Sequence, residues 1–193
     1  MKQILMVIPL SFLLSYSFSQ SQKNFNGTIV YRVSFSINDV QGESRNVTYH
    51  FTDSAIYSYS RDSTTLDTYD LKNAVEILEV TDKDIKKTIE FSDNIGLINK
   101  REEMPNDSLV VLNIFCKLAR IEKSEEIAIS TLSQVYEFYL SPLVYVCPAT
   151  IKDFNFLFNN TFGHIPLKVR SVSDFMDHHK VTEFEAISIT SSK

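Results

Sequence analysis

Residues 28–37 read Thr-Ile-Val-Tyr-Arg-Val-Ser-Phe-Ser-Ile, and apolar and polar side chains alternate along this stretch. One face of the extended chain would carry Ile29, Tyr31, Val33, Phe35 and Ile37. A period of two is typical of a β-strand with one buried face. The stretch therefore predicts a long first strand, and residues 38–45, with Gly42 among them, predict the hairpin loop that follows.

The same alternation recurs along the chain and predicts an antiparallel meander. Further strands are expected at residues 47–51, 55–59, 66–71, 75–80, 87–91, 133–140, 165–172 and 180–189. Pro142 is expected to end the strand at 133–140, and residues 174–179 to form the last hairpin. The predicted fold is therefore mainly β.

Other segments predict loops or a helix. Residues 92–108 predict a long loop, and the charged clusters 101–103 and 122–126 predict solvated loops. Residues 109–118 fit either a helical stripe or two short strands about Asn113. Thr150 as N-cap and Gly163 beyond the last turn predict a short helix at 150–162, with Phe154 and Phe158 on its apolar face.

The first nineteen residues predict a signal peptide. Lys2 precedes an apolar run at 4–14, and Ser17 and Ser19 occupy the small-residue positions before a cleavage site at Gln20. The run is shorter than the roughly 20 residues that span a bilayer. Because no cysteine lies near the cleavage site, we expect an exported, periplasmic or extracellular protein without a lipid anchor or a transmembrane segment. Residues 20–193 then form one β-rich domain.

The composition narrows the possible partners. The chain is 44% hydrophobic and 22% charged, which are values of a globular protein. Its formal net charge is -5, and removal of the signal peptide with Lys2 makes it more negative. Nucleic acids and anionic membranes select for an excess of Lys and Arg, so we expect neither as a partner.

The sequence contains few candidates for catalytic or metal-binding residues. The sequence has four glycines and contains no H-E-x-x-H or C-x-x-C motif. Asp177, His178 and His179, with His164, fit either a metal site or a polar hairpin tip, and neighbouring strand residues point to opposite faces. We therefore predict a protein that is not an enzyme and that has no catalytic residues, metal or cofactor.

The two cysteines, Cys116 and Cys147, follow no metal-binding spacing. They fit either a disulfide or two buried thiols. A disulfide would stabilise the protein by about 3–4 kcal/mol in the chain-entropy model.

The aromatic side chains allow two interpretations. Packed together, they form an ordinary core. Alternatively, a curved sheet and the predicted helix leave a cavity for an acyl chain or another apolar ligand. The candidate ligand-binding residues are Tyr31, Phe35, Tyr49, Phe138, Phe154 and Phe158.

Four short segments resemble the motifs of one protein family. Residues 111–116, Val-Leu-Asn-Ile-Phe-Cys, resemble the family's I-L-G-Y-x-C segment, with Asn113 in the glycine position. Asn tolerates the left-handed backbone that a glycine there would adopt. Residues 135–142 resemble its x-x-W-Y-x-x-x-L strand, with Phe138 in place of Trp, and residues 162–168 resemble its G-L-P-L segment with His164 inserted. Residues 25–31 resemble its F-x-G-x-I-x-Y first strand. In these four segments the chain resembles the GLPGLI family of exported Bacteroidota proteins.

The resemblance implies a curved antiparallel sheet, a half-barrel with one or two short helices similar to the periplasmic lipoprotein carriers. It implies no catalytic residues. The leading hypothesis is an exported module that binds an apolar small molecule or lipid between sheet and helix. The alternative is a structural or protein-interaction module of the cell envelope without a ligand pocket.

Overall fold

The structure is a computed structural model, and it describes residues 24–59, 64–73, 75–80, 83, 85–90, 98–127, 130–144 and 163–192. The predicted signal peptide, the helix at 150–162 and Cys147 lie outside the described residues. Gly163, predicted to follow that helix in a left-handed conformation, has a φ of 63°. The described residues include no helix, and so none that is long and apolar enough to cross a membrane.

One antiparallel sheet holds the twelve described strands. Their bounds are β1 (Gly27–Ile37), β2 (Val40–Gln41), β3 (Arg45–Phe51), β4 (Ala55–Tyr59), β5 (Thr65–Asp70), β6 (Val75–Val80), β7 (Ile85–Glu90), β8 (Ile98–Val111), β9 (Ile114–Ile127), β10 (Ser130–Val144), β11 (His164–Phe175) and β12 (His178–Ser191). The strand order is β7-β6-β5-β4-β3-β1-β12-β11-β10-β9-β8, and β2 pairs only with β1. The sheet is two meanders joined where the first strand pairs with the last.

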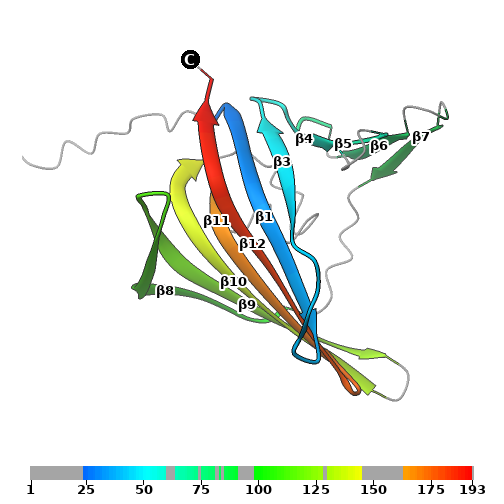
Figure 1. The fold of residues 1–193 in the computed structure, drawn as a ribbon, viewed down its shortest axis with the longest axis vertical. Coiled ribbons are helices and arrows are strands. Elements are labelled where there is room, and N and C mark those ends of the chain that lie inside the picture. The colour runs from blue at the N-terminus through cyan, green and yellow to red at the C-terminus, as the bar shows by residue number, and fades with distance from the viewer. Residues whose placement is uncertain are drawn as a thin grey trace, which may run out of the picture.

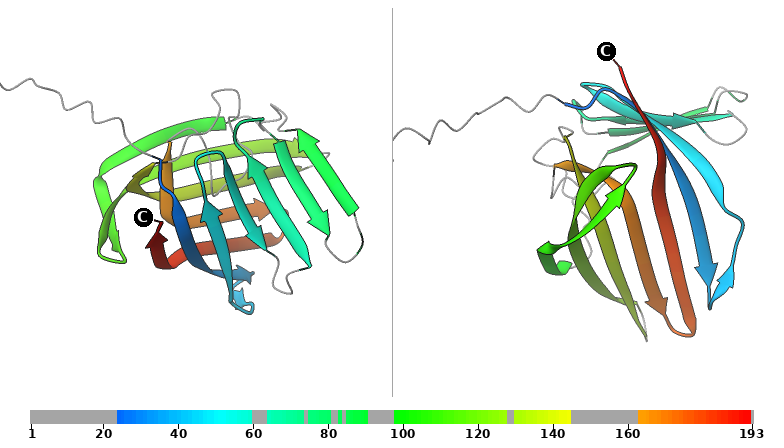
Figure 2. Two further views of the ribbon diagram at one scale, coloured as in Figure 1. Left: turned by 90° about the horizontal axis from the view of Figure 1, so that it is seen from above. Right: turned by 60° about the vertical axis from the view of Figure 1, so that its left-hand side comes forward.

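The sheet is strongly curved and open. Strands β8 to β12, β1 and β3 lie side by side and bend along their length (Figure 1). Seen from above, β4 to β7 lie across from β8 to β10, so the two arms of the sheet face each other (Figure 2). Since β7 and β8 are the two ends of the strand order, the sheet does not close, and its shape is a half-barrel.

The core lies on the inner, concave face of the sheet. Alternate residues of β1 point inward, and Ile29 and Tyr31 are fully buried there. The Tyr31 hydroxyl donates a 2.9 Å hydrogen bond to the carbonyl oxygen of Pro166 on β11. The Tyr31 ring also makes edge contacts with the rings of Tyr49 and Phe184. These contacts tie β1, β3, β11 and β12 to one core.

The predicted strands are confirmed, and so is one of the two alternatives for residues 109–118. This segment forms two strands about a two-residue turn, in which Leu112 and Asn113 have φ values of 51° and 63°. Positive φ at both positions belongs to the turn type that matches the twist of a hairpin. Asn113 therefore has the left-handed backbone expected at the glycine position of the motif.

Two predicted loops and one predicted strand end were wrong. Residues 98–108 belong to β8, residues 122–126 belong to β9, and β10 continues past Pro142 to Val144. Strand β8 is an edge of the sheet, where a strand needs no alternation of apolar side chains and tolerates proline. The register shifts between Met104 and Ser108 and again after Leu140, so irregular pairing accommodates both prolines.

Candidate functional site

Beside the second half of β1, core side chains do not fill the inner face, which forms an open groove of about 810 Å³. Its apolar lining consists of Val33, Phe35, Ile37, Tyr136 and Phe184. Its polar and charged lining consists of Glu43, Ser44, Arg45, Gln134, Ser171, Ser173, Lys180 and Thr182. The volume lies in the range of about 300–1,000 Å³ that small-molecule sites have.

The groove continues the face that carries the core. Val33 is paired with Phe184 and Phe35 with Thr182 in the register of β1 and β12. Partners in the register of a sheet point to the same side. The alternation that buries Ile29 and Tyr31 in the first half of β1 continues in its second half. There it directs Phe35 and Ile37 into the groove, where they are 42% and 43% exposed.

Gly42 lies directly against the ring of Phe35, which lines the groove. The Gly42 N–H donates a 2.8 Å hydrogen bond to the carbonyl oxygen of Phe35. A Cβ at position 42 would collide with the Phe35 ring, so a larger residue there would require the ring to move. The loop is held in place by Asn38, whose backbone and side chain each hydrogen-bond the backbone of His179, at 2.8 and 2.7 Å.

Two cations lie within the groove lining. Arg45 begins β3 and Lys180 lies near the start of β12, and both are exposed. In the described part of the chain neither has a carboxylate partner. Burial and the charge of Asp67 raise the pKa of the Tyr49 phenol to about 12. The positive charge of Arg45 acts in the opposite direction and lowers this pKa.

A smaller cavity of about 290 Å³ adjoins the groove, and both are lined by Arg45 and Phe184. Its distinctive group is Asp67 on β5, whose carboxylate accepts a 2.8 Å hydrogen bond from the Tyr69 hydroxyl. Burial raises the pKa of Asp67, and it also raises the pKa of Glu76 on β6, where the charge of Asp67 adds to the effect. Burial at this end of the inner face therefore disfavours the charged form of both carboxyl groups.

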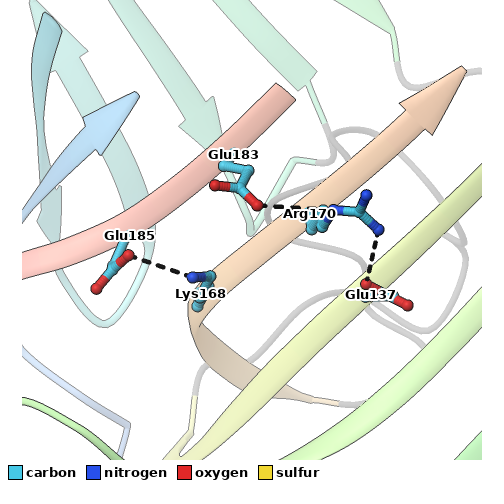
Figure 3. Close-up of polar contacts among 5 residues, drawn as sticks. All are labelled: Glu137, Lys168, Arg170, Glu183 and Glu185. Atoms are coloured by element: carbon cyan, nitrogen blue, oxygen red, sulfur yellow. Dashed lines mark hydrogen bonds and ion pairs between the residues drawn. The ribbon is translucent and has the colours of Figure 1, made fainter. Parts of the chain in front are cut away.

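The outer face of the same strands has a different character. Arg170 on β11 contacts Glu137 of β10 at 3.4 Å and Glu183 of β12 at 3.6 Å (Figure 3). Lys168 contacts Glu185 at 3.3 Å in the next row (Figure 3). Neighbouring charges of opposite sign favour a solvated face over an apolar contact surface.

The predicted ligand-binding residues occupy different places. Phe35 lines the groove and Tyr49 lines the smaller cavity. Tyr31 and Phe138 are buried in the core, at 0% and 1% exposure, and line neither. Phe154 and Phe158 lie outside the described residues.

Sequence reasoning missed Arg45 and Lys180. Arg45 was included in the predicted hairpin loop, whereas the structure makes it the first residue of β3. The position of Lys180 follows from the alternation of β12, in which Lys180, Thr182 and Phe184 share a face.

The remaining candidates do not join the groove. His179 lies at the last hairpin, and its Nδ1 is 2.6 Å from Oδ1 of Asp174. No group of three or more potential metal-ligating side chains converges among the described residues. Cys116 is buried, and its thiol lies 3.5 Å from the carbonyl oxygen of Ile114. Because Cys147 lies outside the described residues, the disulfide stays a prediction.

Comparison with solved structures finds chains that are similar to this one in structure. A Vibrio parahaemolyticus crystal structure described as a "putative outer membrane lipoprotein-sorting protein domain" is similar over 86% of each chain, with a TM-score of 0.33 and 9% sequence identity. No family model and no curated protein matches the chain. The resemblance to the GLPGLI family therefore stays a prediction.

Proposed function

We propose that this protein is an exported, non-enzymatic binding module that shelters an apolar ligand, such as an acyl chain, against the inner face of its curved sheet. The groove of about 810 Å³ supports this proposal most directly, because its apolar lining continues the core face. Binding would remove Phe35 and Ile37 from water, and apolar burial contributes about 25 cal/mol per Å². No residue is assigned a catalytic role.

The first test is to purify the mature chain and examine it by native mass spectrometry, followed by lipid extraction. We expect a co-purified apolar molecule, or saturable binding of a fluorescent fatty acid by the delipidated protein. Phe35→Ser should weaken binding, since it replaces an apolar side chain of the groove by a polar one. Phe115→Ser is the matched control, because Phe115 is 57% exposed and does not line the groove.

A second candidate, a partner-binding module of the cell envelope, is favoured by the tip of the β8–β9 hairpin. Val110, Leu112 and Phe115 are 61%, 41% and 57% exposed there. Exposed apolar side chains that gather in one place often mark interaction sites. The same two variants separate the candidates. If the hairpin tip binds a partner, Phe115→Ser should weaken binding of that partner and Phe35→Ser should leave it unchanged.

A further inference from the structure

We propose that the ligand of the groove is an anionic amphiphile, with Arg45 and Lys180 binding its charged end while the apolar lining holds its chain. This inference rests on the proposed function and specifies the chemistry of the ligand. The groove lining includes two cationic side chains, and a purely apolar ligand does not account for them.

The two cations belong to the same concave surface as the apolar side chains. Lys180 is the register partner of Ile37, and Arg45 is the register partner of Val33, so each cation stands beside an apolar groove residue. An amphiphile has the same pattern, with one charged group and a chain that avoids water. A purely apolar ligand would offer neither cation an oxygen to bind, and it would remove water from both charges at a cost in binding free energy.

Both cations are available to a ligand. On the outer face, Lys168 and Arg170 are already engaged by glutamates at 3.3 to 3.6 Å. Within the described ranges, Arg45 and Lys180 have no such carboxylate partner. Hydrogen bonds from a guanidinium or an ammonium to an anionic oxygen are about twice as strong as neutral ones.

The sign of the groove differs from that of the whole chain. The protein carries a formal net charge of -5, whereas the groove lining holds two cations against one carboxylate, Glu43. General attraction of anions to this protein is therefore unfavourable, and only the local cations of the groove favour an anionic group. Glu43 opposes the anion, so its removal should strengthen binding.

The test compares four ligands by calorimetric titration of the delipidated mature protein: dodecanoate, dodecyl phosphate, dodecanol and dodecylamine. Comparison of dodecanoate with dodecyl phosphate shows whether the groove prefers a carboxylate or a phosphate as the anionic group. We expect dodecanoate to bind about tenfold more tightly than dodecanol, as two partly exposed charge pairs would give. Dodecylamine should bind more weakly than the alcohol, and added salt should reduce the preference for the anions.

The variants locate the charge preference. Arg45→Gln and Lys180→Gln should each weaken dodecanoate binding about three- to fivefold, and the double variant should bind dodecanoate and dodecanol alike. Glu43→Gln should strengthen dodecanoate binding. Arg32→Gln is the matched control, because Arg32 lies on β1 but points to the opposite face, and it should change nothing.

Two results would overturn the inference separately from the proposed function. If the wild-type protein binds dodecanoate and dodecanol equally well, the groove is an apolar site without charge recognition. If the preference for the anion survives in the double variant, other residues read the charge. If neither ligand nor the phosphate binds, the proposed function itself fails together with the inference.

Discussion

The hydrogen bond between the Tyr31 hydroxyl and the carbonyl oxygen of Pro166 gives a direct test of how the sheet is held together. Tyr31 is fully buried, and the 2.9 Å bond joins residues that are 135 positions apart in the sequence. Burial raises the pKa of the phenol, so the hydroxyl stays protonated and donates across the accessible pH range. Tyr31→Phe removes this donor and leaves the ring in place.

The expected cost follows from that geometry. Loss of a buried hydrogen bond with one polar partner left behind lowers the free energy of unfolding by about 1–3 kcal/mol. For a domain of this size about 1 kcal/mol corresponds to about 2–4 °C in the thermal midpoint. Urea unfolding at equilibrium and a thermal scan of the same samples measure both quantities.

Tyr57→Phe is the control, since Tyr57 is half-buried on the outer face, where its ring stacks on His50 at 4.9 Å, and its hydroxyl has no hydrogen bond among the described residues. We expect a change within about 0.5 kcal/mol for this variant. Equal stabilities of the two variants would refute the view that the Tyr31 hydroxyl links β1 to β11.

Three further changes test other features of the structure. Asp67→Asn should raise stability at pH 7 by about 0.5 kcal/mol and have little effect near pH 4. Because the pKa values of Asp67 and Glu76 are raised in the folded state, this state binds more protons than the unfolded state, and the wild-type protein loses stability as the pH rises from 4 to 7. If the stability of the variant depends on pH as that of the wild type does, Asp67 is not the group responsible. Leu112→Asn should stabilise the β8–β9 hairpin by about 0.5–1 kcal/mol, because a left-handed backbone suits Asn better than Leu; denaturant titration measures it, and a loss of stability would show that Leu112 packs usefully. Gly42→Ala should push the Phe35 ring from its position and weaken fatty-acid binding severalfold, with the far-ultraviolet spectrum unchanged; undiminished affinity would mean that the ring does not shape the groove.

The strands that could be predicted from the sequence are those with one solvent-exposed face and one buried face. In β1 the alternation of Ile29, Tyr31 and Val33 with polar residues marks the face directly, and β11 and β12 behave in the same way. The edge strand β8 gave no such signal, because its first half is rich in charged residues. An edge strand is held by backbone pairing with one neighbour, and side-chain periodicity does not record that pairing.

The groove could be predicted only in part. Phe35 was accessible to sequence reasoning because it extends the apolar face of β1, and it does line the groove. Arg45 and Lys180 were not, since a charged residue beside a predicted turn is expected to be solvated whatever face it is on. Where the core ends along β1 depends on the curvature of the whole sheet, and no local pattern encodes that curvature.

The pairing of β1 with β12 also determines when the fold can form. Gly27 lies opposite Ser191, so the two strands at the middle of the sheet are the ones that lie farthest apart along the described part of the chain. Until β12 emerges, each meander exposes a long strand edge and half of a core. Contacts this distant in sequence slow folding and lengthen the time in which aggregation competes with it. A chaperone that holds the unfolded chain should therefore raise the yield of folded protein, and a circular permutant that places β12 directly before β1 should fold faster than the natural order.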